Sequence, residues 1–428
     1  MPNTLTKWTT HILGDLCDIC RGSSPRPIAD QRYFVDGTIP WIKIADATKS
    51  GKYLYKTKEH VNEFGASFSR YLPAGSLIIA ASGTLGYPQM LGVKGCAHDG
   101  WLIPSNFRGI DSHFLYYYFL WKKEFFYSSA YGAAIQNINT MILKEMEVTI
   151  PSLPTQRMIA SILSAYDDLI ENNTRRIAIL EEMAQAIYRE WFVNFRFPGH
   201  ENVKFVDSPL GKIPEGWEAG VVNDLLELLS GFAFKSKTFI DEGDYKVVTI
   251  KHVHDGVFQP NSMSLLDSPP DRMPSHCHLE TADVLMSLTG NIGRTCLVFG
   301  ENYLLNQRVA KLHPHRQEDR PLVYWMFRSP ETRQRLEQIA NGVAQQNLSP
   351  VQTGKMAVPI PPVDLRDRYS EVASPMVEAI LSLNRKNFNL RTTRDLLLPK
   401  LISGQLDVED LDIDVGMTAE ELTEAAAG

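Results

Sequence analysis

The chain has 428 residues, 44% of them hydrophobic, and a formal net charge of −7 at pH 7. This length exceeds one typical domain, and the apolar content excludes a disordered chain. No apolar run approaches the 18 residues of a membrane span, and the N-terminus lacks a signal-peptide pattern, so we expect a cytoplasmic protein without membrane contact. The five cysteines, an odd number, favour a reducing compartment without a disulfide framework.

The acidic balance is concentrated at the C-terminus. Residues 407–428 hold eight acidic side chains and no Lys or Arg, so we expect an acidic, flexible tail. The other 406 residues carry 43 basic against 42 acidic side chains. This nearly neutral body permits nucleic-acid binding but lacks a strong basic footprint.

Residues 1–152 predict a first globular domain of the α+β class. The run "SLIIAAS" (76–82) is typical of a buried strand and ends in a Gly-x-x-Gly turn, while "EVTI" (147–150) is also strand-like. The stretch "HFLYYYFLWKKEFFYS" (113–128) favours helix. Short strands, turns and late helices together indicate α+β.

Residues 153–197 predict a long central helix. Residues 155–192 contain no Gly or Pro, and a stripe recurs every seven residues, as in a coiled-coil seam. Its seam positions are Ile159, Tyr166, Asn173, Leu180 and Ile187. Asn173 either fixes the pairing register or lies half exposed at the seam. Residues 198–220, polar and interrupted by Pro and Gly, predict a linker.

Residues 221–362 repeat the first domain. "GAAIQNINTMILKEMEVTIPSLPTQ" (132–156) returns as "GVAQQNLSPVQTGKMAVPIPPVDLR" (342–366). "LGDLCDICRG" (13–22) matches "VNDLLELLSG" (222–231), Lys43 aligns with Lys251, and the Gly83 turn aligns with the Gly290 turn. The offset drifts only from 207 to 210, so the chain is an internal duplication. "DVLMSLT" (283–289), "YKVVTI" (245–250) and "LVYWMFRSPETRQRLEQIA" (322–340) predict two strands and a helical stretch.

Residues 363–406 predict a second long helix in the same register as the first. Its seam positions are Tyr369, Met376, Leu383, Leu390 and Leu397. Pro375 interrupts this pattern, which predicts either a kink or the true start of the helix.

The pattern offers no catalytic, cofactor or metal site. Cys17 and Cys20 have a C-x-x-C spacing, but the repeat places Leu226 and Leu229 there, so we expect apolar core positions. His276, Cys277 and His278 alternate along the chain and are poorly placed to converge on one metal. P-loop, dinucleotide-binding and nucleophile-elbow motifs are absent, and no acid, base or nucleophile cluster is duplicated. The duplication therefore favours a binding protein.

With these features the chain resembles the specificity subunits of type I restriction-modification systems. The resemblance extends from about Trp8 to Leu406. It rests on two globular domains, each followed by a long helix, and on the repeated Gln-Asn…Ile-Pro entry to that helix. It also rests on two segments that look like the central and C-terminal conserved ends of that family. These ends are "YREWFVNFRFPGHE" (188–201) and "LLLPKLISGQL" (396–406). The second copy departs from the first at Arg366, which replaces Gln156, and at Pro375.

The resemblance implies two target-recognition domains on antiparallel coiled-coil helices with pseudo-twofold symmetry. Each domain would recognise half of a bipartite, asymmetric site in double-stranded DNA. The helices would dock two adenine-methyltransferase subunits, and motor-nuclease subunits would join the complex. S-adenosylmethionine and ATP are expected on those partner subunits, and the chain itself would be non-catalytic.

Candidate DNA contacts are polar or basic side chains on loops that the repeat places alike. Arginine suits guanine, and Asn or Gln suits adenine. In the first domain the candidates are Arg21, Ser23, Ser24, Arg26, Lys43, Thr84, Gln89 and Lys94. In the second they are Ser230, Lys235, Lys251, His252, Asn291, Arg294, Gln307 and Arg308. For each of them a solvated loop side chain is the alternative. Gln136, Asn137, Gln346 and Asn347 are expected to have capping or turn roles instead.

Two other functional classes remain open at this stage. A fused methyltransferase-nuclease would need a cofactor loop and a catalytic motif. A coiled-coil scaffold without sequence preference would bind random and selected DNA alike.

Overall fold

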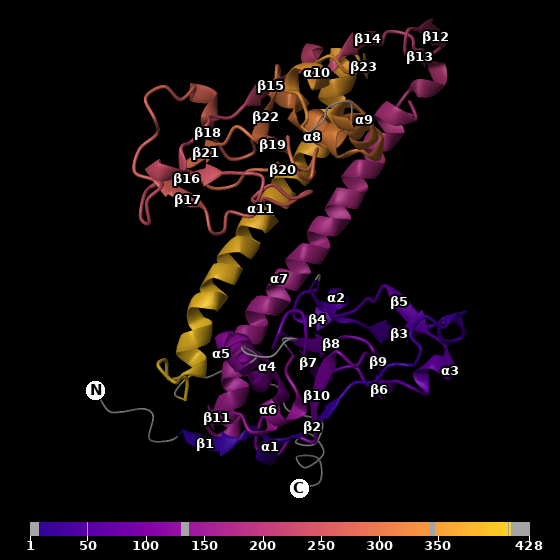
Figure 1. The fold of residues 1–428 in the computed structure, drawn as a ribbon. Coiled ribbons are helices and arrows are strands. Elements are labelled where there is room, and N and C mark those ends of the chain that lie inside the picture. Colours follow the sequence, from indigo (N-terminus) through magenta and orange to yellow (C-terminus); the bar gives the residue numbers. More distant parts are fainter. Residues whose placement is uncertain (1–7, 49, 130–136, 342–346, 410, 412–428) are drawn as a thin grey trace. The chain divides into compact units, whose positions relative to one another are not determined.

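The computed structural model describes residues 8–48, 50–129, 137–341, 347–409 and 411. The chain forms two compact units (Figure 1). Unit 1 comprises residues 1–171 and 389–428, and unit 2 comprises residues 172–388. Most of the predicted acidic tail (407–428) lies outside the described residues. In the part of the chain that is described, no helix is long and apolar enough to cross a membrane.

Unit 1 contains a strand pair and two larger sheets. β1 (Thr9–Ile12) pairs antiparallel with β11 (Glu147–Ile150). One sheet has the order β2-β10-β7-β8-β4 and the other β5-β3-β9-β6. Their strands are β2 (Asp18–Arg21), β3 (Ile39–Ile42), β4 (Tyr53–Leu54), β5 (Glu59–Val61), β6 (Arg70–Leu72), β7 (Leu77–Ala80), β8 (Pro88–Leu91), β9 (Gly95–Ala97) and β10 (Trp101–Ser105). The strands predicted within 76–82 and 147–150 are confirmed as β7 and β11.

The short helices of unit 1 are α1 (Leu13–Leu16), α2 (Ile44–Ala47), α3 (Glu63–Ala66), α4 (Ser112–Trp121), α5 (Lys123–Ser129) and α6 (Thr140–Lys144). They pack against different sheets, since α4 contacts β7 and β8 whereas α3 contacts β5. Asp111 caps α4, since its carboxylate accepts from the Phe114 N–H at 2.8 Å. Phe114, Tyr117 and Phe119 are fully or almost fully buried, which explains why so aromatic a stretch forms a helix here. The predicted helical stretch 113–128 is confirmed.

Unit 2 repeats this plan. β14 (Glu218–Val221) pairs with β23 (Ala357–Ile360), and two four-stranded sheets have the orders β15-β22-β19-β20 and β17-β16-β21-β18. Their strands are β15 (Leu226–Ser230), β16 (Tyr245–Val248), β17 (Ser264–Leu266), β18 (His278–Leu279), β19 (Val284–Ser287), β20 (Thr295–Leu297), β21 (Tyr303–Leu305) and β22 (Val309–Pro314). The helices are α8 (Arg320–Arg328), α9 (Pro330–Asn341) and α10 (Pro350–Gly354). The predicted strands and helical stretch are confirmed as β16, β19, α8 and α9.

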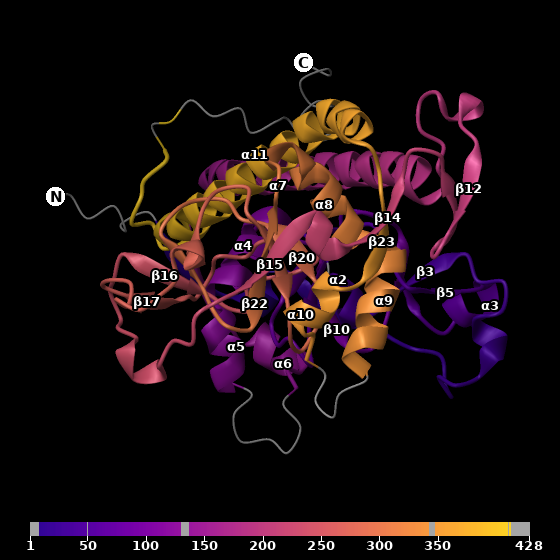
Figure 2. The same ribbon diagram turned by 90° about the horizontal axis from the view of Figure 1, so that it is seen from above.

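The segment predicted as a linker contains secondary structure of its own. β12 (Phe205–Ser208) and β13 (Gly211–Pro214) form a hairpin, which projects from the rest of unit 2 (Figure 2). β14 follows and closes the unit by pairing with β23.

The two long helices are confirmed as α7 (Leu153–Tyr188), extended by a π-helical turn at Arg189–Val193, and α11 (Val363–Ile402). Each helix contributes a segment to each unit. In unit 2 the segments pack antiparallel, because Asn173 Nδ2 donates to Asn387 Oδ1 at 2.9 Å while Phe192 packs on Tyr369. In unit 1 Arg394 pairs with the buried Asp167.

Two details of these helices settle alternatives left open by the sequence. Asn173 is bonded across the seam to Asn387, which is only 2% exposed, and this favours a register role over a frayed seam. The prediction that Pro375 marks the start of the second helix is wrong. α11 begins at Val363, where the Arg366 N–H donates to the Pro362 carbonyl, and it continues through Pro375. The alternative of a kink at Pro375 stays a prediction, because an interior proline removes one backbone donor and its ring crowds the carbonyl four residues earlier.

The predicted apolar core position is confirmed for Cys17, whereas Cys20 is only half-buried. Cys17 is fully buried, as is Leu226 at the corresponding place in unit 2. Burial raises the pKa of Cys17 to about 12. Its thiol is therefore a small apolar core group rather than a thiolate ligand.

Candidate nucleic-acid interface

A three-residue loop, His98–Gly100, joins β9 to β10 in unit 1, and hydrogen bonds fix it at both ends. The His98 N–H donates to the Ile42 carbonyl at 3.1 Å, and the Ala81 N–H donates to the Gly100 carbonyl at 2.8 Å. The Gly100 N–H donates to Nδ1 of His98 at 2.9 Å. The loop is thus fixed to β3 and to the end of β7.

Asn306–Arg308, between β21 and β22, has the same frame in unit 2. The Asn306 N–H donates to the Val248 carbonyl at 3.0 Å, and the Leu288 N–H donates to the Arg308 carbonyl at 3.0 Å. The Arg308 N–H donates to Oδ1 of Asn306 at 3.2 Å. Donors, acceptors and chain positions correspond one by one, so the duplication extends to individual hydrogen bonds.

A glycine packs against each loop because a side chain would not fit. The Gly22 N–H donates to the Trp101 carbonyl, and the Gly231 N–H donates to the Val309 carbonyl. A Cβ at Gly22 would lie 2.2 Å from the His98 carbonyl oxygen, and one at Gly231 would lie 2.3 Å from that of Asn306. Backbone cannot move aside cheaply, so this close approach requires glycine.

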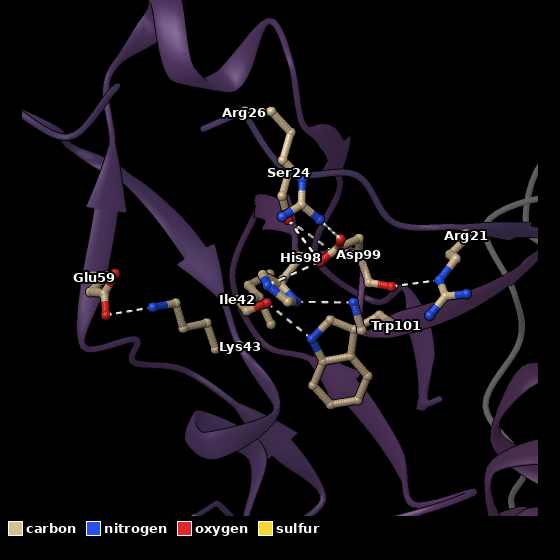
Figure 3. Close-up of polar contacts among 10 residues, drawn as sticks. Arg21, Ser24, Arg26, Ile42, Lys43, Glu59, His98, Asp99 and Trp101 are labelled. Atoms are coloured by element: carbon tan, nitrogen blue, oxygen red, sulfur yellow. Dashed lines mark hydrogen bonds and ion pairs between the residues drawn. The ribbon is translucent and has the colours of Figure 1, made fainter. Parts of the chain in front are cut away.

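The side chains of the two loops differ although their frames agree. In unit 1 the Asp99 carboxylate pairs with Arg26 and accepts from Ser24 Oγ at 3.0 Å (Figure 3). Arg21 Nε donates to the Asp99 main-chain oxygen at 2.6 Å. Ser23, which lies between Arg21 and Ser24 in the sequence, donates its N–H to the Ala97 carbonyl. Four predicted DNA contacts therefore lie next to this loop, namely Arg21, Ser23, Ser24 and Arg26. Asp99 thus binds both predicted arginines, Arg21 and Arg26.

His98 and Lys43 border this arginine cluster. Burial lowers the pKa of His98 below its ordinary value, and Lys43, Arg26 and Arg21 lower it further, while Asp99 acts in the opposite direction. Since Nδ1 of His98 accepts from Gly100, its proton lies on Nε2, 3.0 Å from Asp99 Oδ1. Lys43 pairs with Glu59 at 2.6 Å and lies 4.4 Å from the centre of the Trp41 ring.

In unit 2 the loop itself provides the polar side chains. Gln307 and Arg308 are both exposed, and within the described part of the chain neither side chain makes a hydrogen bond. Ser230, at the end of β15, is exposed as well, and its carbonyl lies 2.9 Å from Nε2 of His276. No counterpart of the Asp99–Arg26 pair was found among the described residues of this loop.

The Gly-x-x-Gly turns lie beside these loops. All four glycines have positive φ, between 69° and 74°, which explains their occurrence at both turns. Thr84 lies in the first turn, while Asn291 and Arg294 line a recess of about 390 Å³ at the second, together with Arg333 and Glu337. Asn347 bridges to Thr289 next to this turn, consistent with a structural role. Gln136 and Gln346 lie outside the described residues.

The remaining predicted residues do not join these clusters. Gln89 is fully buried and donates to the Lys52 carbonyl at 2.7 Å, and His252 is 4% exposed, so neither side chain is available to DNA as folded. Lys94, Lys235 and Lys251 are exposed, but no described contact joins them to either loop. The alignment of Lys43 with Lys251 is wrong. Ile42 pairs with Ala97 as Val248 pairs with Leu305, which places Thr249 at the position of Lys43.

Sequence reasoning missed His98, Asp99 and Asn306. The signal was present, because the offset of 208 that relates Trp101 to Val309 also relates Asp99–Gly100 to Gln307–Arg308. Among the described residues no group of His, Cys, Asp and Glu could hold a metal ion. Cys277 is fully buried whereas His278 is exposed, so these neighbours point apart.

Comparisons with known proteins agree with this duplication. The family described as "Type I restriction modification DNA specificity domain" matches residues 6–182 and again 214–367. The type I restriction enzyme MjaIX specificity subunit of Methanocaldococcus jannaschii is 25% identical over 417 residues, covering 94% of each chain. The MjaVIII specificity subunit of the same organism is 22% identical, covering 95% of this chain and 94% of that protein. The crystal structure of the S subunit of a type I restriction-modification system from M. genitalium shares the fold, with a TM-score of 0.60, 16% identity, and coverage of 94% of this chain and 97% of that one.

Proposed function

The chain belongs to the type I restriction-modification DNA specificity family, and from this premise we propose that each unit recognises one half of a bipartite, asymmetric DNA site. The chain is the specificity subunit of such a system and is not itself catalytic. Unit 1 would use the loop cluster around Asp99, and unit 2 the loop Asn306–Arg308.

One observation carries this proposal: the two loops have the same backbone frame and different side chains. Phosphate contacts carry no sequence information, whereas side chains that reach base edges do. Two equivalent supports with divergent side chains suit two different half-sites better than one repeated half-site. The predicted contacts retained on or beside these loops are Arg21, Ser23, Ser24, Arg26, Lys43, Thr84, Ser230, Asn291, Arg294, Gln307 and Arg308.

The proposal extends to partner subunits that carry the chemistry. We place S-adenosylmethionine on two methyltransferase subunits and ATP on motor-nuclease subunits. The long helices leave large apolar side chains exposed, among them Leu169, Ile179 and Leu396, each more than half exposed. Such side chains suit protein partners. Partners would also supply phosphate contacts that a chain of net charge −7 lacks.

A domain exchange tests the proposal. Residues 208–350 would be replaced by the matching region of a relative, and the chain co-expressed with its methyltransferase subunits. Methylated adenines would then be mapped by single-molecule sequencing. We expect one half of the methylated sequence to change and the other to persist. A change in both halves would contradict the modular assignment, and no change would contradict recognition by this chain.

The reciprocal exchange of residues 9–129 serves as the matched control and should change only the other half. A gel-shift of the assembled complex on random and on selected DNA distinguishes the scaffold alternative, which predicts equal binding to both.

A further inference from the structure

Gln307 and Arg308 combine a fixed backbone with unengaged side chains. The Gln307 N–H donates to the Phe232 carbonyl at 3.0 Å, and both polar groups of the Arg308 backbone are bonded, to Asn306 and to Leu288. Their side chains are exposed and make no hydrogen bond within the described residues. A rigid backbone reduces the entropy lost on binding, and free donors and acceptors remain available to a ligand.

The equivalent loop of unit 1 cannot present the same groups. Asp99 stands at the position of Gln307, and its carboxylate is engaged by Arg26 and Ser24. Gly100 stands at the position of Arg308 and has no side chain. The same frame therefore offers a neutral amide and a guanidinium in unit 2, but an occupied carboxylate and a bare backbone in unit 1.

These groups have complementary partners on the edges of purines. A guanidinium donates two parallel hydrogen bonds to O6 and N7 of guanine, and a glutamine amide accepts from N6 and donates to N7 of adenine. We propose that Arg308 recognises a guanine and Gln307 an adenine in the half-site of unit 2. This inference rests on the proposed function and names the residues and base chemistry behind it.

The surroundings of the loop support a DNA-facing position. The Leu288 N–H bonded to Arg308 directly precedes the segment that leads into the Gly290–Gly293 turn. That turn borders the recess lined by Asn291, Arg294, Arg333 and Glu337, in which Arg333 is paired with Asp255 at 2.7 Å. Basic side chains beside a base-contacting loop can position the duplex through its phosphates without affecting which base is chosen.

Single substitutions test this assignment. Arg308→Ala, Arg308→Lys and Gln307→Ala would each be co-expressed with the methyltransferase subunits, with Arg272→Ala, which removes another exposed arginine of unit 2, as the control. Arg308→Ala should lower methylation of the original site about tenfold or more and make one guanine position degenerate. Arg308→Lys should retain part of the preference, and Gln307→Ala should make one adenine position degenerate. The other half-site and the Arg272→Ala pattern should remain unchanged.

Two results would overturn the inference. An unchanged sequence preference in the Arg308→Ala and Gln307→Ala complexes would exclude a base contact. A uniform loss of methylation on all sequences, with a weaker salt dependence, would assign Arg308 to a phosphate instead. Either result leaves the proposed function intact if the exchange of residues 208–350 still changes one half-site. Thermal unfolding of each variant checks that the exposed substitutions leave the fold unchanged.

Discussion

The loop His98–Gly100 of unit 1 and the loop Asn306–Arg308 of unit 2 have equivalent backbone hydrogen bonds but chemically different side chains. In unit 1 the loop supplies an acid, Asp99, which holds arginines from the β2 end of the chain. In unit 2 the loop supplies the arginine itself. The difference shows how a duplicated domain can diverge in recognition without altering its fold, because the last two residues of each loop contribute no side chain to the hydrogen bonds that maintain its shape.

In unit 1 Asp99 is a positioning residue. It binds Arg26 through its side chain and Arg21 through its main chain, so it fixes where both guanidinium groups point (Figure 3). In unit 2 the Arg308 main chain is bonded to Asn306 and Leu288, while its guanidinium makes no hydrogen bond among the described residues.

The largest effect is expected at the glycines that both loops share. Gly22→Ala and Gly231→Ala each bring a Cβ against a carbonyl oxygen, and should lower the free energy of unfolding by about 1–3 kcal/mol through strain. Gly51→Ala is the matched control, because a Cβ there meets nothing within 4 Å. Chemical denaturation measures all three. If only one of the two glycines proved sensitive, the frames would not be equivalent in solution.

An intermediate effect is expected at Asp99. Asp99→Ala releases Arg26, and discrimination in the half-site of unit 1 should fall about tenfold, while Asp99→Asn should preserve part of it. Stability should change by less than about 1 kcal/mol, since the Arg26 side chain is 64% exposed. Methylation mapping and thermal unfolding measure the two quantities, with Glu147→Ala as an exposed acidic control. Loss of the unit 2 half-site instead would contradict the positioning role.

The smallest effect concerns the pH dependence of unit 1. The folded pKa of His98 is lowered, so the unfolded chain binds more protons and stability falls as pH drops below the unfolded pKa of about 6.5. His98→Asn introduces the residue of unit 2, keeps an acceptor for the Gly100 N–H and removes this loss. Thermal unfolding of the whole chain at pH 7.5 and 5.5 should show a smaller decrease in the variant, by under about 1 kcal/mol. An equal decrease in wild type and variant would mean that His98 does not titrate in this range; His60→Asn is the control.

The sequence by itself determined the duplication, the α+β class and the long helices. Apolar positions repeated every seven residues and recurring strand-turn patterns depend on local spacing along the chain. Such patterns predict helices and strands whatever the tertiary contacts are. The buried state of Cys17 followed for the same reason, since its repeat partner is leucine. Arg308 and Gln307 were also identifiable, as polar side chains next to a strand.

Only the tertiary structure decided which candidates share a surface. Gln89 and His252 are polar residues in strand and turn positions, and nothing local in the chain shows that Gln89 lies inside and bonds to the Lys52 carbonyl. Lys43 and Lys251 were expected to occupy equivalent positions in the two units. The pairing of β3 with β9 and of β16 with β21 instead makes Thr249 the equivalent of Lys43, because parallel pairing joins residues far apart in sequence. Asp99 gained its role in the same way: it lies more than seventy residues from Arg26 along the chain, and pairing of β2 with β10 brings the two together. Residue type and spacing are local properties, whereas contacts across a sheet depend on how the whole chain folds.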